Sequence, residues 1–202
     1  MPKTKDISSN KKKIEVIIET SVRHIHLAKP DIDQLFGKNY KLTSLRHLSQ
    51  NHEFASNEVA DLKTVKSILK NVRVLGPARD YTQVELAKTD AFYLGLNPLV
   101  RMSGNLENTP GLTIIGPKGE VNISEGVILS YRHIHCSAAQ AKQHGLEHKQ
   151  IVKVKTKGER AVIFKNVIIK VGKGFNWRFH IDTDEANAAE VDNSNNIGEV
   201  II

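Results

Sequence analysis

The tetrapeptide Arg-His-Ile-His occurs twice in this chain of 202 residues, at positions 23–26 and 132–135. Each copy follows a strand-like segment and precedes a short helix-like segment that ends at a glycine, Gly37 in the first half and Gly145 in the second. Repetition of a supersecondary unit indicates that a fold is assembled from related parts. We therefore expect two related small units rather than one large domain.

A second echo ties the two halves more closely. Glu85 is followed by Thr-Asp-Ala at positions 89–91, and His180 is followed at the same offsets by Asp-Glu-Ala at positions 184–186. Glu85 and His180 therefore occupy corresponding places in the two halves. A functional role of one of them predicts a comparable role for the other.

Short β-branched segments bounded by glycine turns make up most of the remaining chain, a pattern typical of sandwiches and barrels. Helical patterns are few, and the clearest are residues 29–36 and residues 137–144, where Ser137 is a candidate N-cap. We predict a mainly β fold of two related small antiparallel β-barrels with short capping helices. The expected strands are residues 14–18, 72–75, 84–86, 112–115, 121–123, 127–129, 151–154, 161–164 and 167–171.

The composition is that of an ordinary globular protein, with 40% hydrophobic and 25% charged residues. No apolar run approaches the length needed to cross a bilayer, so we expect no membrane association. Residues 1–13 are rich in Lys, Ser and Asn and lack the apolar centre of a secretory signal. We expect a disordered basic lead-in and a cytoplasmic protein.

The net charge of +7 favours anionic partners. Nucleic acid is not expected, because aromatic residues make up only 5% of the chain and no basic strand carries aromatic side chains for base stacking. A phosphate-bearing small molecule is the preferred partner, and a merely solvated basic surface is the alternative. The single cysteine, Cys136, excludes both an intramolecular disulfide and a zinc site built from several thiolates.

The repeated histidines suit a metal site. Residues two apart on a strand point to the same side, with Cα atoms roughly 6–7 Å apart, so His24 and His26 can reach one ion, as can His133 and His135. One such pair alone is more often a pair of surface histidines, but two copies in the same context favour metal binding. The four histidines at positions 47, 52, 144 and 148 have no partner at this spacing and are expected on the surface.

A catalytic zinc ion has three protein ligands and one open position. Glu85 and His180, which correspond in the repeat, are the candidates for the third ligand of each site. Arg79 lies six residues before Glu85, where its planar guanidinium suits phosphate, although spacing alone favours a surface turn residue. Cys136 follows the second histidine pair, but strand alternation turns it away from His135, so we expect a packed cysteine rather than a nucleophile.

With these residues in view, the chain resembles the phosphate propanoyltransferase family, the phosphotransacylases of the propanediol-utilisation type. The similarity runs from about residue 16 to residue 189. It is carried by residues 21–27 (Ser-Val-Arg-His-Ile-His-Leu), 35–37, 48–50, 74–77 (Val-Leu-Gly-Pro), 82–85 (Thr-Gln-Val-Glu), 89–91, 101–104 (Arg-Met-Ser-Gly), 125–127, 132–135 and 180–187 (His-Ile-Asp-Thr-Asp-Glu-Ala-Asn).

The resemblance implies two zinc ions between two barrels that are interleaved in sequence. Residues 23–130 would form one barrel, and residues 14–22 would join residues 131–202 in the other. Phosphate would bind at Arg79. The implied ligands are His24, His26 and Glu85 for the zinc that faces the sulfur of coenzyme A, and His133, His135 and His180 for the second zinc, with Asn187 close by.

The implied reaction converts a short-chain acyl-CoA (acetyl or propanoyl) and phosphate into acyl phosphate and CoA by direct transfer. Two alternatives use the same residues: a zinc-dependent thioester hydrolase that activates water, and a binding module in which zinc is structural. The family also suggests a homodimer. Many relatives in microcompartments carry an amphipathic targeting helix, and residues 1–13 lack such a stripe, so we do not expect encapsulation.

Overall fold

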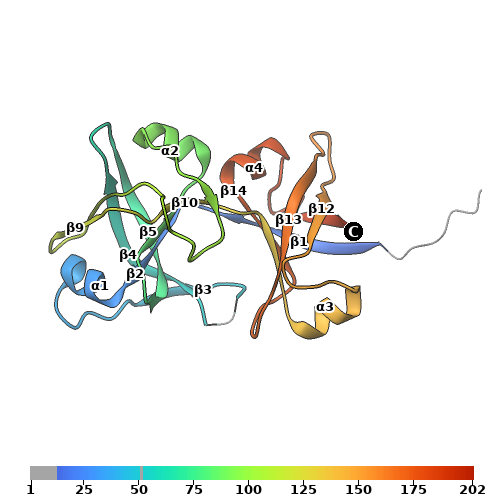
Figure 1. Ribbon diagram of the computed structural model, residues 1–202, viewed down its shortest axis with the longest axis horizontal. Coiled ribbons are helices and arrows are strands. Elements are labelled where there is room, and N and C mark those ends of the chain that lie inside the picture. The colour runs from blue at the N-terminus through green and yellow to red at the C-terminus, as the bar shows by residue number, and fades with distance from the viewer. Residues whose placement is uncertain (1–12, 51) are drawn as a thin grey trace, which may run out of the picture.

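The computed structural model describes residues 13–50 and 52–202. The lead-in expected at residues 1–13 therefore lies outside the described residues, apart from Lys13. Two β-sheets lie side by side along the long axis of the molecule, and short helices cover their outer sides (Figure 1). Within the described residues, no helix is long and apolar enough to cross a membrane.

The first sheet has nine strands and curls without closing. The order is β7-β10-β6-β2-β5-β4-β8-β9, with β3 beside β4. The strand β2 lies parallel to β5 and antiparallel to β6. The strands are β2 (His24–Ala28), β3 (Ser44–His47), β4 (Phe54–Lys63), β5 (Ile68–Arg79), β6 (Gln83–Glu85), β7 (Val100–Arg101), β8 (Leu112–Ile115), β9 (Glu120–Ile123) and β10 (Val127–Ser130).

The second sheet closes into a six-stranded barrel in the order β1-β14-β11-β13-β12-β15. The N-terminal strand β1 lies parallel to β14 and antiparallel to β15, so the two ends of the described chain build one barrel. The strands are β1 (Ile14–Ser21), β11 (His133–Cys136), β12 (Ile151–Lys155), β13 (Ile163–Val171), β14 (Arg178–Asp182) and β15 (Ile197–Ile201).

The expected mainly β architecture is confirmed. Only the second sheet is a closed barrel, and several neighbouring pairs are parallel, among them β2 with β5 and β11 with β13. The division into residues 23–130, and residues 14–22 with 131–202, stays our proposal for the domain boundaries. Each sheet has its own cluster of buried hydrophobic residues.

Four short helices follow the strands that carry the candidate site residues. The helices expected from the sequence are α1 (Lys29–Phe36) and α3 (Ala138–His144), and Ser137 is the N-cap of α3, with a reciprocal bond to Gln140. The other two are α2 (Lys88–Leu94) after β6 and α4 (Thr183–Ala188) after β14. The helices α2 and α4 lie next to each other over the junction of the two sheets (Figure 1), where the Thr89 N–H donates to Asp184 at 2.7 Å.

Strand alternation sorts the repeated tetrapeptides into a core face and a cleft face. In β2, Ile25 is fully buried in the first core, so the histidines at 24 and 26 face the other way. In β11, Ile134 and Cys136 enter the barrel core and leave His133 and His135 on the opposite face. Burial raises the pKa of the Cys136 thiol, which keeps it protonated.

Candidate active site between the two sheets

One cleft of about 1060 Å³ lies between the sheets and is lined by residues of both. It contains both histidine pairs together with both predicted third ligands and the predicted phosphate-binding arginine. Asn187 is exposed in α4 and is not among the lining residues, so its place beside a zinc ion stays a prediction. Predicted site residues in the cleft are His24, His26, Arg79, Glu85, His133, His135 and His180.

The first group is His24, His26 and Glu85. Glu85 lies directly across from His24 in the pairing of β6 with β2, so both side chains leave the same face of the sheet. The His24 Nε2 atom is 3.7 Å from Glu85 Oε2, and one possible ligand atom from each of the three residues lies within 4.8 Å of the others. Small side-chain rotations would bring all three onto one ion.

The second group is built in the same way. His180 lies across from His133 in the pairing of β14 with β11. The ring of His133 is 4.5 Å from that of His135 and 5.2 Å from that of His180, and the rings of His135 and His180 are 4.8 Å apart, measured between centroids. The correspondence of Glu85 and His180 in the sequence is therefore a correspondence of position in the two sheets.

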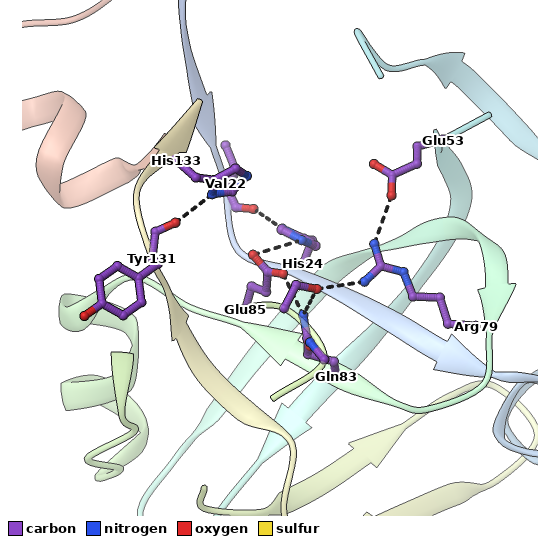
Figure 2. A network of polar contacts seen from close by, with 10 residues as sticks. Val22, His24, Glu53, Arg79, Gln83, Glu85, Tyr131 and His133 are labelled. Carbon is purple, nitrogen blue, oxygen red and sulfur yellow. Dashed lines mark hydrogen bonds and ion pairs between the residues drawn. The ribbon is translucent and has the colours of Figure 1, made fainter. Parts of the chain in front are cut away.

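The first histidine of each pair is oriented by a backbone carbonyl two residues earlier (Figure 2). His24 Nδ1 lies 2.8 Å from the Val22 oxygen, and His133 Nδ1 lies 2.6 Å from the Tyr131 oxygen. A carbonyl oxygen only accepts, so Nδ1 carries the proton and Nε2 keeps its lone pair. Such a bond is the usual way in which a metal-binding imidazole is fixed.

Burial keeps most of these imidazoles neutral. It lowers the pKa of His26, His133 and His135 below the ordinary value of 6.5, and it lowers the pKa of His180 to about 4. Both ring nitrogens of His135 are buried, and no described residue bonds to either. Buried neutral imidazoles, beside a carboxylate in one group, fit the ligand requirements of zinc, although His180 Nε2 accepts from the Gln50 amide at 3.3 Å.

Gln83 is a residue that the sequence did not single out. Its Nε2 atom donates to Glu85 at 2.6 Å (Figure 2). The same atom donates to Ser103 Oγ at 3.0 Å, and its Oε1 atom accepts from the Gly104 N–H at 2.8 Å. The amide therefore fixes the Glu85 carboxylate against the turn after β7. Alternation on β6 places residues 83 and 85 on one face, which is the signal that could have found it.

Arg79 ends β5 at the wall of the cleft. Its guanidinium donates from Nη1 to Ser103 Oγ at 3.0 Å and from Nη2 to Glu53 Oε1 at 2.9 Å (Figure 2). One end of the Arg79 guanidinium thus already binds a carboxylate oxygen. Of the four histidines expected on the surface, His47 is exposed but also lines this cleft.

The arginine that opens each tetrapeptide has a structural partner. Arg23 forms an ion pair of 2.7 Å with Asp90 of α2, and Arg132 forms one of 2.7 Å with Glu185 of α4. Asp90 and Glu185 correspond in the two halves of the sequence, because they follow Glu85 and His180 at the same offset. Each arginine therefore ties its histidine-bearing strand to the helix that follows the third candidate ligand.

Comparison with known proteins identifies the family. A family model described as phosphate propanoyltransferase matches residues 17–192. A phosphate propanoyltransferase of Thermotoga maritima is 47% identical over 175 residues, which cover 86% of this chain and 83% of the relative. Proteins of the same name from Listeria monocytogenes and Lachnoclostridium phytofermentans are 42% and 41% identical, covering 86% and 91% of this chain and 81% and 86% of the relatives. The chain thus belongs to the phosphate propanoyltransferase family of acyltransferases.

Proposed function

We propose that the protein transfers a short-chain acyl group, acetyl or propanoyl, between coenzyme A and phosphate. The observation that carries this proposal is the single cleft in which both histidine groups lie together with Arg79. A reaction between two bound substrates needs both of them in one place and in a fixed orientation. Family membership supports the same reaction.

Two zinc ions are part of the proposal. His24, His26 and Glu85 would hold the first, and His133, His135 and His180 would hold the second. Zinc in these sites supplies Lewis-acid neutralisation of the negative charge on sulfur and on phosphate oxygen. Three protein ligands in each group leave room for a substrate, which distinguishes these groups from structural sites that are closed by four protein ligands.

Arg79 would bind phosphate and aim one oxygen at the thioester carbonyl. The bond between the Arg79 guanidinium and the Glu53 carboxylate supports this role, because an oxyanion is already accepted there. In the reaction a bond forms between phosphate oxygen and the acyl carbon, the bond from that carbon to sulfur breaks, and sulfur leaves with the electron pair. The arginine holds its charge in place before the reaction, so little reorganisation is needed.

Direct transfer without an acyl-enzyme is the proposed route. The cysteine next to the second histidine pair, Cys136, is fully buried in the barrel core on the side away from the cleft. Its thiol would have to reach through the strand to attack a thioester. A Cys136→Ser variant is expected to stay active, whereas a folded, zinc-loaded and inactive variant would favour a covalent route.

The proposal is tested by incubating the purified protein with acetyl-CoA or propanoyl-CoA, with and without phosphate. The expected result is thiol release that depends on phosphate and is matched by acyl phosphate, trapped as the hydroxamate. Thiol release without phosphate would instead identify a thioester hydrolase. Full activity after complete removal of metal would overturn the zinc part of the proposal, and size-exclusion chromatography with light scattering tests the predicted homodimer.

A further inference from the structure

Lys170 is a cleft residue that the proposed mechanism does not use. It lies on β13, directly across from His135 in the parallel pairing of β13 with β11. Directly paired residues of neighbouring strands project from the same face, so the Lys170 side chain enters the cleft beside the second histidine group. It is one of the residues that line the cleft.

The Lys170 ammonium has no bonded partner among residues 13–50 and 52–202: no hydrogen bond or ion pair is formed with any of them. Its Nζ atom lies 5.9 Å from the centroid of the Phe175 ring. The side chain is partly buried, and this burial lowers its pKa. The Nζ atom itself is not buried, so the ammonium at the end of this partly buried side chain is open to the cleft and available to bind an anionic ligand there.

Arg79 and Lys170 approach the cleft from opposite sheets. Arg79 ends β5 of the open sheet, and Lys170 projects from β13 of the barrel. Both residues line the same cleft, together with the carboxylates of Glu53 and Glu85. The cleft that Lys170 lines also contains both histidine groups, and Lys170 is paired directly with His135 of the second.

We propose that Lys170 is a second phosphate-binding cation of this site, which binds a phosphate oxygen from the barrel wall while Arg79 binds another from the sheet wall. The inference rests on the proposed function. Inorganic phosphate carries between one and two negative charges near neutral pH, so two flanking cations match it. Two contacts from opposite walls also fix the direction of the attacking oxygen, which a single arginine does not.

The position of Lys170 favours the transferred phosphate over the phosphates of CoA. In CoA the pantetheine arm separates the thioester from the nucleotide phosphates. A cation beside the two histidine groups is near the reacting thioester and therefore far from the nucleotide end. Loss of Lys170 should consequently affect the two substrates unequally.

The test compares Lys170→Met with Lys170→Arg and with Lys165→Met, in zinc-loaded protein. Lys165 lies on the same strand, is exposed and does not line the cleft, so it is the matched control. We expect Lys170→Met to raise the KM for phosphate about 10- to 100-fold, as for the loss of one charge-assisted hydrogen bond, with little change in the KM for acyl-CoA. Lys170→Arg should retain most of the phosphate affinity, and Lys165→Met should behave as the wild type.

Phosphate binding is also measured directly, by calorimetric titration of the zinc-loaded proteins in the absence of acyl-CoA. Weaker binding to Lys170→Met at unchanged zinc content and unchanged melting temperature supports the proposal. An unchanged phosphate affinity, a KM effect confined to acyl-CoA, or a loss of zinc would overturn it. If the wild type transfers no acyl group to phosphate, the proposed function fails, and the titration still decides whether Lys170 binds phosphate.

Discussion

The two histidine groups share one plan and differ in one ligand. In both, a pair of histidines two residues apart projects from a strand, a backbone carbonyl fixes the first imidazole, and the third residue lies directly across on the next strand. That third residue is a carboxylate in the first group, Glu85, and an imidazole in the second, His180. The groups are therefore equal in architecture and unequal in charge.

The charge difference has a chemical meaning. A divalent cation held by two neutral imidazoles and a carboxylate keeps one net positive charge, whereas one held by three neutral imidazoles keeps two. Under the proposed function, the more positive group would hold phosphate and the less positive one would hold the sulfur of the thioester. Lys170 reinforces this contrast, because it adds a positive charge beside His135, whereas the Gln83 amide that donates to Glu85 carries no net charge.

The strongest way to break the comparison is to remove the first histidine of each pair. Because both groups are needed in the proposed reaction, His24→Ala and His133→Ala should each lower kcat/KM by roughly a thousandfold or more. Each variant should also lose one of two bound zinc ions, measured by atomic emission. Loss of both ions from one variant would mean that the groups are not independent.

Removal of Arg79 should separate phosphate binding from metal binding. We expect Arg79→Met to lower kcat/KM for phosphate by about a hundredfold, because a charge-assisted contact to the phosphate is lost. The zinc content should stay at the wild-type level. Normal phosphate kinetics in Arg79→Met would instead indicate that the guanidinium has only a structural role, through its bonds to Glu53 and Ser103.

The second histidine group should contribute more than the first to the pH dependence of the free energy of unfolding. The folded-state pKa is lowered for His26 in the first group and for all three histidines of the second, so the unfolded chain binds more protons below pH 6.5. Metal-free protein should therefore lose stability as the pH falls from about 6.5 toward 4, and be insensitive above it. The loss is about 1.4 kcal/mol per pH unit for each fully linked histidine.

This dependence is measured by urea unfolding of metal-free protein at pH 7.5, 6.0 and 5.0. His180→Gln should flatten the dependence of the unfolding free energy on pH, because one titrating imidazole is removed. His144→Gln, which lies outside both groups, is the control. A curve that stays steep in His180→Gln and flattens in His144→Gln would contradict the assignment.

The smallest expected effect concerns the arginines of the repeated tetrapeptide. Arg23→Met and Arg132→Met each leave a partly buried carboxylate unpaired, and we expect each to cost about 1 kcal/mol in the free energy of unfolding. Arg23→Met should cost more, since the side chain of Asp90 is 10% exposed compared with 18% for Glu185, which also keeps a bond from the Asp182 N–H. Chemical denaturation checks this order, and Asp90→Asn and Glu185→Gln are the partner controls.

Periodicity and repetition in the sequence predicted the strand faces of the site and the correspondence of its two halves. The spacing of His24 and His26 predicted a shared face, because alternation along a strand is a local property, and the sequence echo paired Glu85 with His180. The helices α2 and α4 were missed because each lacks part of the signal that revealed α3, which has an N-cap serine and a closing glycine. The helix α2 begins after Ala87 without a side-chain cap, and α4 ends at Ala189 rather than at a glycine. Lys170 and Ser103 were missed because a place in the cleft depends on which strands become neighbours, and no local pattern encodes this. Gln83 was missed although its alternation with Glu85 on one strand could have indicated it.

The pairing of β1 with strands from the other end of the chain also sets the order of events in biosynthesis. Every strand of the open sheet is present once residue 130 has emerged from the ribosome, but β1 then still lacks both of its neighbours, β14 and β15. The barrel can close only after β15 has been made. The barrel wall of the cleft is thus completed only after residues 197–201 have emerged, later than the wall formed by the open sheet.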